Sequence, residues 1–223
     1  RSQPGYTHKK EDRHHWKARA ASRTAAYEAA GRYSEPPSSI WSEIKSVYMD
    51  LQGFKCGFCE RRLEKSEFGN VEHDVEHFRP KSLVAGWPPN AAPERGDGLN
   101  FDLGAPADPG YFLLAHHPEN YLISCKTCNT ALKGNGFPVD GSRDNAMTSP
   151  RQTTERHFLV YPLGMVDEDP QRLIRFEGVV PVPAARSGHR RRRGQVIINF
   201  FQLAERDGLL EERSMTILGL HLA

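Results

Sequence analysis

Residues 71–80 read VEHDVEHFRP, and they carry the densest group of reactive side chains in this 223-residue chain. Five of the six residues from Glu72 to His77 are ionisable, which is more than a solvated strand needs. A histidine titrates near neutral pH and can accept a proton from water, and a neighbouring carboxylate can bind a cation. The valines favour an extended backbone, so residues 70–78 are predicted to form a strand that carries a candidate catalytic site.

Two cysteine pairs with the same spacing flank this segment, Cys56 with Cys59 and Cys125 with Cys128, and the chain has no further cysteine. A two-residue gap lets both sulfurs of a pair face one ion, and four thiolates form a tetrahedral zinc site. Two disulfides or a thioredoxin-like redox motif are the alternatives. No export signal is visible at the start of the sequence, which favours zinc. The 65 residues between the pairs are more than a zinc ribbon needs, so an insertion is expected there.

The residues before the first pair predict two helices. Residues 8–31 are rich in alanine and charge, and Gly31 is the first break in that pattern. Ser38 or Ser39 can cap a second helix, with Glu43 placed for a capping box. Apolar residues at helical spacing predict one buried face on this second helix: Ile40, Ile44, Val47, Tyr48 and Leu51.

The remaining residues predict an α+β fold. Residues 85–110 are rich in proline, glycine, asparagine and aspartate and predict a long loop, and a short helix is expected at 129–133. Strands are expected at 158–161, 173–176 and 178–183, with a turn at 167–170, and helices at 195–204 and 209–218. Three segments follow: an N-terminal helical segment (1–52), a core with the zinc knuckles (53–140), and C-terminal strands and helices (141–223).

The order of motifs resembles the HNH, or ββα-metal, endonucleases. The matching residues are Glu76-His-Phe-Arg-Pro80, then Asn120, then Cys125-Lys-Thr-Cys-Asn129. More narrowly, segments 56–60, 76–82, 111–115 and 119–125 resemble the HNH subunit of Septu-type and retron-associated anti-phage systems. The resemblance covers residues 40–140 well and the remainder loosely. It implies a ββα-metal core with a structural four-cysteine zinc site and a C-terminal α/β extension.

The resemblance also implies roles for individual residues. His77 would be the general base, and Glu76 and Asn129 would bind a catalytic Mg²⁺ or Mn²⁺, which prefer oxygen ligands. Asn120 would hold the loop that aims His77.

Several basic residues are candidates for contact with DNA phosphates. Arg79 and Lys133 lie within the motif, and for each of them a salt bridge is the alternative. The second candidate is a basic block that is either a phosphate contact or a solvated face: Arg190, Arg191, Arg192 and Arg193.

The histidines need to be distinguished from one another. His77 is favoured over His73 as the base because only His77 has a proline three residues later. His73 and Asp74 would support the site or form a local salt bridge. His116 and His117 are expected to be loop residues rather than ligands.

The motifs together favour a metal-dependent DNA endonuclease over two alternatives. One alternative is a non-catalytic zinc-knuckle module, and the other is the same site cleaving RNA. The net charge of +2 does not by itself identify a nucleic-acid binder.

No run approaches the roughly 18 apolar residues of a membrane span, so a cytoplasmic protein is expected. A nuclease there needs restraint, and no phosphate-binding Gly-x-x-x-x-Gly-Lys loop is present. The resemblance implies that an ATPase partner supplies this control.

Overall fold

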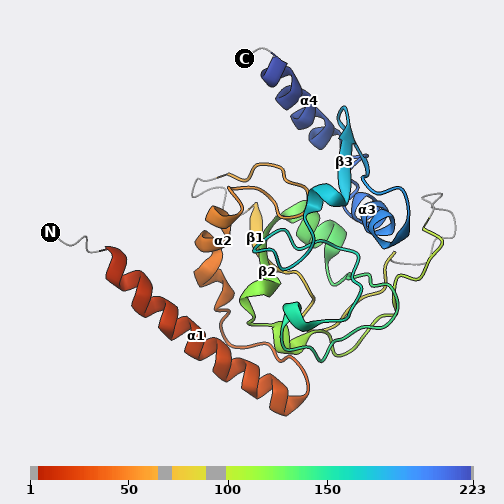
Figure 1. The fold of residues 1–223 in the computed structure, drawn as a ribbon. Coiled ribbons are helices and arrows are strands. Elements are labelled where there is room, and N and C mark those ends of the chain that lie inside the picture. Colours follow the sequence, from red (N-terminus) through yellow and green to blue (C-terminus); the bar gives the residue numbers. More distant parts are fainter. Residues whose placement is uncertain (1–4, 65–71, 89–98, 222–223) are drawn as a thin grey trace.

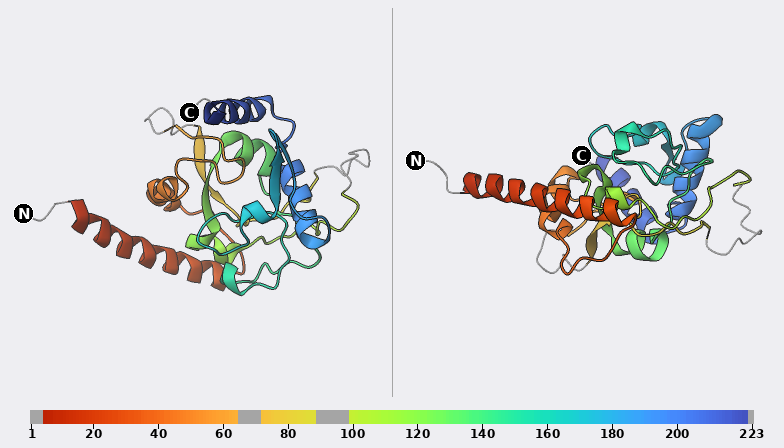
Figure 2. Two further views of the ribbon diagram at one scale, coloured as in Figure 1. Left: turned by 45° about the horizontal axis from the view of Figure 1, so that its top comes forward. Right: turned by 90° about the horizontal axis from the view of Figure 1, so that it is seen from below.

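The computed structural model describes residues 5–64, 72–88 and 99–221, which form a mixed α+β structure with two small antiparallel sheets (Figure 1). Its helices and strands are α1 (Gly5–Ala30), α2 (Lys45–Leu51), β1 (His73–His77), β2 (Tyr121–Cys125), β3 (Ile174–Glu177), β4 (Val180–Pro183), α3 (Gly188–Phe200) and α4 (Asp207–His221). Helix α1 extends away from the body, and α4 lies on a different side of it (Figure 2). None of the described helices combines the length and apolar character that crossing a membrane requires.

Strands β1 and β2 form the centre of the fold. They pair antiparallel, with His73 opposite Cys125 and His77 opposite Tyr121. Every residue of β2 is buried, which explains its nearly continuous apolar sequence. A π-helical segment, η5 (Thr127–Lys133), follows β2 and packs against it. The order of these three elements along the described chain is therefore strand, strand, helix. This region contains the segment with Glu76 and His77 and the second cysteine pair.

The N-terminal segment packs on this centre through α1. Trp16, Ala20 and Tyr27 recur at helical spacing and are buried. The indole Nε1 of Trp16 donates a hydrogen bond of 2.7 Å to the carbonyl of Ile40. This contact joins α1 to the segment that begins the next helix.

The second helix, α2, differs from the prediction in how it begins and in which of its side chains are buried. It begins with the 3₁₀ turn Trp41–Ile44, and no side chain caps that turn, so the predicted serine capping box is wrong. The carboxylate of Glu43 instead accepts hydrogen bonds from Arg19 of α1. Val47 and Leu51 are 50% and 63% exposed, so the buried face is shorter than predicted.

The C-terminal segment contains one strand fewer than predicted. Residues 158–161 are buried but irregular, because the carbonyls of Phe158 and Leu159 accept hydrogen bonds from the Arg193 side chain at 3.2 and 2.7 Å instead of joining a ladder. Strand β3 pairs with β4 across a turn at Gly178, whose φ of +60° suits glycine. Helix α3 begins at Gly188, seven residues earlier than predicted, so the arginine block is helical.

A buried ion pair joins α3 to the irregular segment before β3. Arg193 is 5% exposed, and its guanidinium reaches Asp167 at 2.9 and 2.6 Å. His157 adds a contact of 2.9 Å to the same carboxylate. Burial alone would raise the pKa of Asp167, but the hydrogen bonds from His157 and Arg193 outweigh burial and hold that pKa well below its ordinary value.

Replacing Arg193 with glutamine should therefore lower the free energy of unfolding by about 3–5 kcal/mol, because the carboxylate of Asp167 loses its main buried partner. Arg191→Gln is the matched control, since Arg191 is exposed on the same helix and should change stability by less than about 0.5 kcal/mol. Chemical denaturation measures both variants. Equal stability of the two variants would contradict a structural role for Arg193.

The same ion pair predicts a pH dependence. The depressed pKa of the Asp167 carboxyl stabilises the fold at pH values above its unfolded-state pKa, and this stabilisation is lost as the pH falls. Acid should therefore destabilise the wild type more than Arg193→Gln.

Candidate active site and metal centre

The four cysteines form a single buried cluster. Their sulfur atoms all lie within 4.8 Å of one another, and the thiols are free. The Sγ atoms of Cys59 and Cys125 are 3.9 Å apart. Zn–S bonds of about 2.3 Å in a tetrahedron place the sulfurs about 3.8 Å apart, so this donor set fits zinc. The predicted grouping of both pairs is confirmed, and the cluster can hold one zinc ion.

Hydrogen-bond donors surround this cluster. The backbone N–H of Cys125 points to the sulfur of Cys56 at 3.4 Å. The guanidinium of Arg206 donates to the sulfur of Cys128 at 3.3 Å. Four thiolates around Zn²⁺ leave a net negative charge, and Arg206 offsets part of it. Arg206 lies 78 residues beyond Cys128, and no sequence spacing links the two.

Arg206→Gln should weaken zinc binding by roughly 10-fold or more, because donors around the ligands tune metal affinity. Competition with a chelating dye measures this affinity directly. Arg175→Gln is the matched control, since Arg175 is an exposed arginine on β3 that pairs with Glu177. Equal zinc affinity in the two variants would show that Arg206 does not support the metal centre.

A second cluster lines a cavity of about 240 Å³ at the end of β1. Glu76 and His77 of β1 and Asn129 of η5 contribute to its wall. Helix η5 folds back along the sheet after β2, which brings Asn129 to the strand end that carries His77 (Figure 1). Three of the predicted site residues therefore meet in one cavity. Lys81, which the sequence-based site did not include, lines the same cavity.

The imidazole of His77 is held in one orientation. Its Nε2 lies 3.0 Å from the carbonyl oxygen of Ala115. Since a carbonyl only accepts, the neutral ring carries its proton on Nε2, and Nδ1 keeps a lone pair. Within the described part of the chain no hydrogen bond reaches Nδ1. Burial, assisted by the charge of Lys81, lowers the pKa of His77 well below its ordinary value, so the ring is neutral at neutral pH.

Asn120 ties together the two segments that surround His77. Its Oδ1 accepts from the backbone N–H of Arg79 at 2.7 Å, and its Nδ2 donates to the carbonyl of Arg79 at 3.0 Å. The same Nδ2 donates to the carbonyl of Leu114 at 3.1 Å. Leu114 precedes Ala115, the hydrogen-bond partner of His77. The buried amide thus connects the loop after β1 to the backbone that holds the imidazole.

Lys133 binds Glu76 rather than pointing to solvent. Its Nζ lies 2.6 Å from Oε1 of Glu76 and 3.1 Å from the carbonyl of His77. Its side chain is fully buried, so the salt bridge that was the alternative for Lys133 is the one observed, and a phosphate contact by this side chain is not. Burial raises the pKa of Glu76, and the charge of Lys133 opposes this rise.

Two oxygen donors in the cavity remain without a protein partner. Within the described residues, Oε2 of Glu76 accepts no hydrogen bond, and the side chain of the half-buried Asn129 makes none. A carboxylate and an amide oxygen suit Mg²⁺ or Mn²⁺, which keep several waters. These two donors therefore fit the divalent ion that the resemblance to HNH endonucleases implied.

Arg79 is a core residue. Its side chain is 2% exposed and lies 3.2 Å from the buried carboxylate of Glu155. Its guanidinium also packs among the rings of Phe78, Tyr111 and Phe137. The salt bridge that was the alternative for Arg79 is therefore the one observed, and a phosphate contact by this side chain is not.

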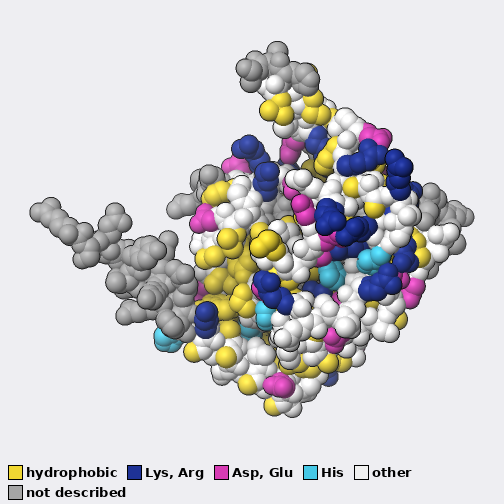
Figure 3. Space-filling view, in the orientation of Figure 1, with side chains coloured by type: hydrophobic (Ala, Val, Ile, Leu, Met, Phe, Trp, Pro, Cys, Tyr) yellow, Lys and Arg dark blue, Asp and Glu magenta, His cyan; other side chains and the backbone are white. Residues whose placement is uncertain are grey.

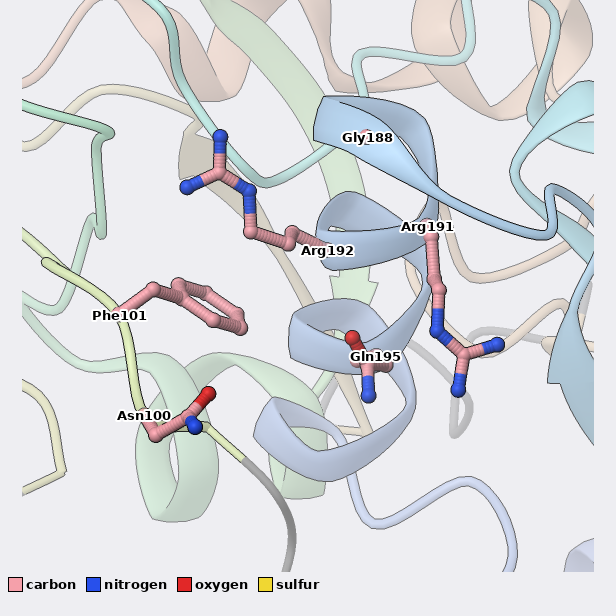
Figure 4. A pocket seen from close by; sticks show the side chains of 6 residues that line it. All are labelled: Asn100, Phe101, Gly188, Arg191, Arg192 and Gln195. Carbon is pink, nitrogen blue, oxygen red and sulfur yellow. The ribbon is translucent and has the colours of Figure 1, made fainter.

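The arginine block does not form one phosphate-binding face. A helical turn of 100° per residue points its four side chains in different directions, and basic side chains are spread among acidic ones on the side that holds α3 and β3 (Figure 3). Arg190 pairs with Glu168, and Arg192 lies 2.8 Å from Asp140. A shallow hollow of about 370 Å³ lies between α3 and the segment at 100–101 (Figure 4), lined by Asn100, Phe101, Gly188, Arg191, Arg192 and Gln195. Among the described ion pairs, none includes Arg191.

Among the described side chains, the other histidines lie outside the cavity lining. His73 is buried at the other end of β1, and Asp74 pairs with Lys126, the local salt bridge that was one alternative. His116 lies in the turn between the 3₁₀ segments Phe112–Leu114 and Pro118–Asn120, as expected of a loop residue. It is buried and stacks on Trp41 with ring centres 5.8 Å apart. Burial lowers the pKa of His116 to about 4.

The fold and these two clusters define a mixed α+β protein with a buried four-cysteine cluster that can hold a metal ion and with a histidine-containing cavity. No family model matches the chain, and no solved structure matches it. The chain is similar to the Septu protein PtuB of Bacillus mycoides (strain KBAB4), with 27% identity over 179 residues. These residues are 80% of this chain and 52% of that protein, so the chain spans about half the length of the curated relative it matches. This similarity supports the resemblance to Septu-type proteins.

Proposed function

We propose that this protein is a metal-dependent HNH endonuclease that hydrolyses phosphodiester bonds of DNA in anti-phage defence. One observation carries the chemistry: a neutral histidine with a free nitrogen, a carboxylate and an amide line the same cavity. The order β1, β2, η5 supports a ββα-metal core around that cavity. The similarity to a Septu protein supports the role in defence.

The residues of the cavity would divide the work of hydrolysis. Nδ1 of His77 would accept a proton from the attacking water, since Nε2 is engaged by Ala115. Lys133 would keep Glu76 ionised despite its burial. Glu76 and Asn129 would hold Mg²⁺ or Mn²⁺, and a bound ion supplies charge stabilisation to the phosphate and the leaving oxygen. Asn120 would act as a positioning residue through the backbone near Ala115.

The direct test is cleavage of supercoiled plasmid by the purified protein with Mg²⁺, with Mn²⁺, and with EDTA. Nicked or linear plasmid in the presence of either ion, and intact plasmid with EDTA, is expected. A single-stranded RNA of matched length is assayed in parallel, and cleavage of RNA alone would favour the RNA alternative. A protein that binds nucleic acid but cuts neither substrate, alone or with its neighbouring gene products, would favour the non-catalytic module.

We propose that an ATPase subunit controls the nuclease, as the resemblance to Septu-type systems implies. A nuclease without sequence preference would damage the genome of its own cell unless a second component restrained it. Co-expression with the neighbouring genes, followed by size exclusion, should yield a complex whose cleavage responds to ATP. Elution of the protein alone, with full activity in isolation, would contradict this partner but not the nuclease.

A further inference from the structure

The cavity that contains His77 needs a cation for an anionic substrate, and two of the basic residues near it are already engaged. Arg79 is buried against Glu155, and Lys133 is buried against Glu76. Lys81 lines the cavity, and no ion pair within the described residues includes it. Lys81 is therefore the cation in the cavity wall that is available to a ligand.

Aromatic rings hold the Lys81 ammonium in place. Its Nζ lies 4.8 Å from the ring centre of Tyr33 and 5.1 Å from that of Trp41. A cation over an aromatic face is attracted to it, but the ring supplies no oxygen acceptor. The three N–H donors of the ammonium thus keep capacity for an anion.

The same indole contacts the proposed base. The ring centres of Trp41 and His77 are 4.9 Å apart, in an edge-to-face arrangement. Trp41 therefore contacts both Lys81 and His77. Tyr33 and Trp41 come from the segment between α1 and α2, so the N-terminal part of the chain contacts residues of the cavity wall without lining the cavity itself.

We propose that Lys81 binds a non-bridging oxygen of the scissile phosphate, which is attacked by the water that His77 deprotonates. Tyr33 and Trp41 would position the ammonium group of Lys81. This inference rests on the proposed nuclease function. It names the catalytic cation of the site and assigns it to a residue next to Pro80 rather than to Arg79, Lys133 or the arginine block. The phosphate would supply an ion-pair partner, which Lys81 does not have among the described residues.

Two variants separate the charge of Lys81 from its bulk. Lys81→Met removes the charge and should lower kcat/KM for plasmid nicking by roughly 10²-fold, as loss of one donor to a developing anion does. Lys81→Arg keeps the charge and should retain activity within about 10-fold of wild type. Arg175→Gln removes one positive charge from an exposed position on β3 and should leave the rate unchanged. Circular dichroism and zinc content should be unchanged in all three variants.

A binding measurement tests the contact independently of cleavage. In a His77→Ala background, affinity for a duplex oligonucleotide is measured against salt concentration. Removing one phosphate contact lowers the slope of log affinity against log salt by about 0.9, so Lys81→Met should show this drop and Arg175→Gln should not. An unchanged slope would overturn the assignment of Lys81 whether or not the wild type cuts. Failure of the wild type to cut, together with the expected drop in slope, would overturn the nuclease and leave Lys81 as a phosphate contact.

Discussion

Replacing His77 with alanine is expected to slow DNA cleavage by roughly 10²–10⁴-fold, the usual effect of losing a general base. Within the described residues, no hydrogen bond reaches one nitrogen of the imidazole, and the other is positioned by its 3.0 Å contact with the carbonyl of Ala115. Zinc content and circular dichroism should stay normal, because the cysteine cluster does not include His77. Single-turnover nicking of supercoiled plasmid measures the rate.

His73→Ala is the matched control for this experiment. His73 lies on the same strand and is buried, but it does not line the cavity. It should retain cleavage, whereas an inactive His73→Ala beside an active His77→Ala would show that the other histidine is the base.

The rate should also depend on pH in a defined direction. The pKa of His77 is held well below its ordinary value by burial, so the neutral base persists at neutral pH. The rate should therefore stay level from neutral pH down to the ordinary histidine range near 6.5, and fall only in more acidic buffer.

Replacing Cys128 with serine is expected to unfold the core rather than slow the reaction. A structural zinc site contributes folding free energy directly, and the loss of one thiolate removes much of it. Elemental analysis should find one zinc per wild-type chain and much less in Cys128→Ser, together with loss of the cooperative thermal transition. Thr127→Ala changes an exposed neighbour in the same turn and should keep both zinc and stability. A wild type without zinc, or a folded Cys128→Ser with full zinc, would contradict the structural metal.

Local patterns were enough to predict much of the framework. Helix α1 was expected from its alanine-rich turns, and the structure confirms it with small shifts at its ends. Strand β1 and the helical turn after Cys128 were also expected, because β-compatible residues and the turn of a cysteine knuckle act over a few residues. The cysteine cluster followed from the same reasoning, since each Cys-x-x-Cys turn presents two sulfurs together.

Errors occurred where a distant partner decides the local structure. Residues 158–161 have the composition of a strand, but the side chain of Arg193 takes two of their carbonyls. The serine cap before α2 is absent, and Glu43 pairs with Arg19 of another helix. In each case a charged side chain far along the chain outweighed a local preference.

The sequence by itself determined the candidate residues for metal binding and catalysis: the four cysteines, Glu76, His77 and Asn129. Only the tertiary structure decided which cations remain available to a substrate. Nothing in the sequence distinguishes Arg79, Lys133 and Arg193 from basic side chains on the surface. In the structure, each of them is buried against a carboxylate from another part of the chain. The physical reason is that the role of a charged side chain depends on the nearest opposite charge and on its exposure. Both are set by packing between segments that spacing along the chain does not connect.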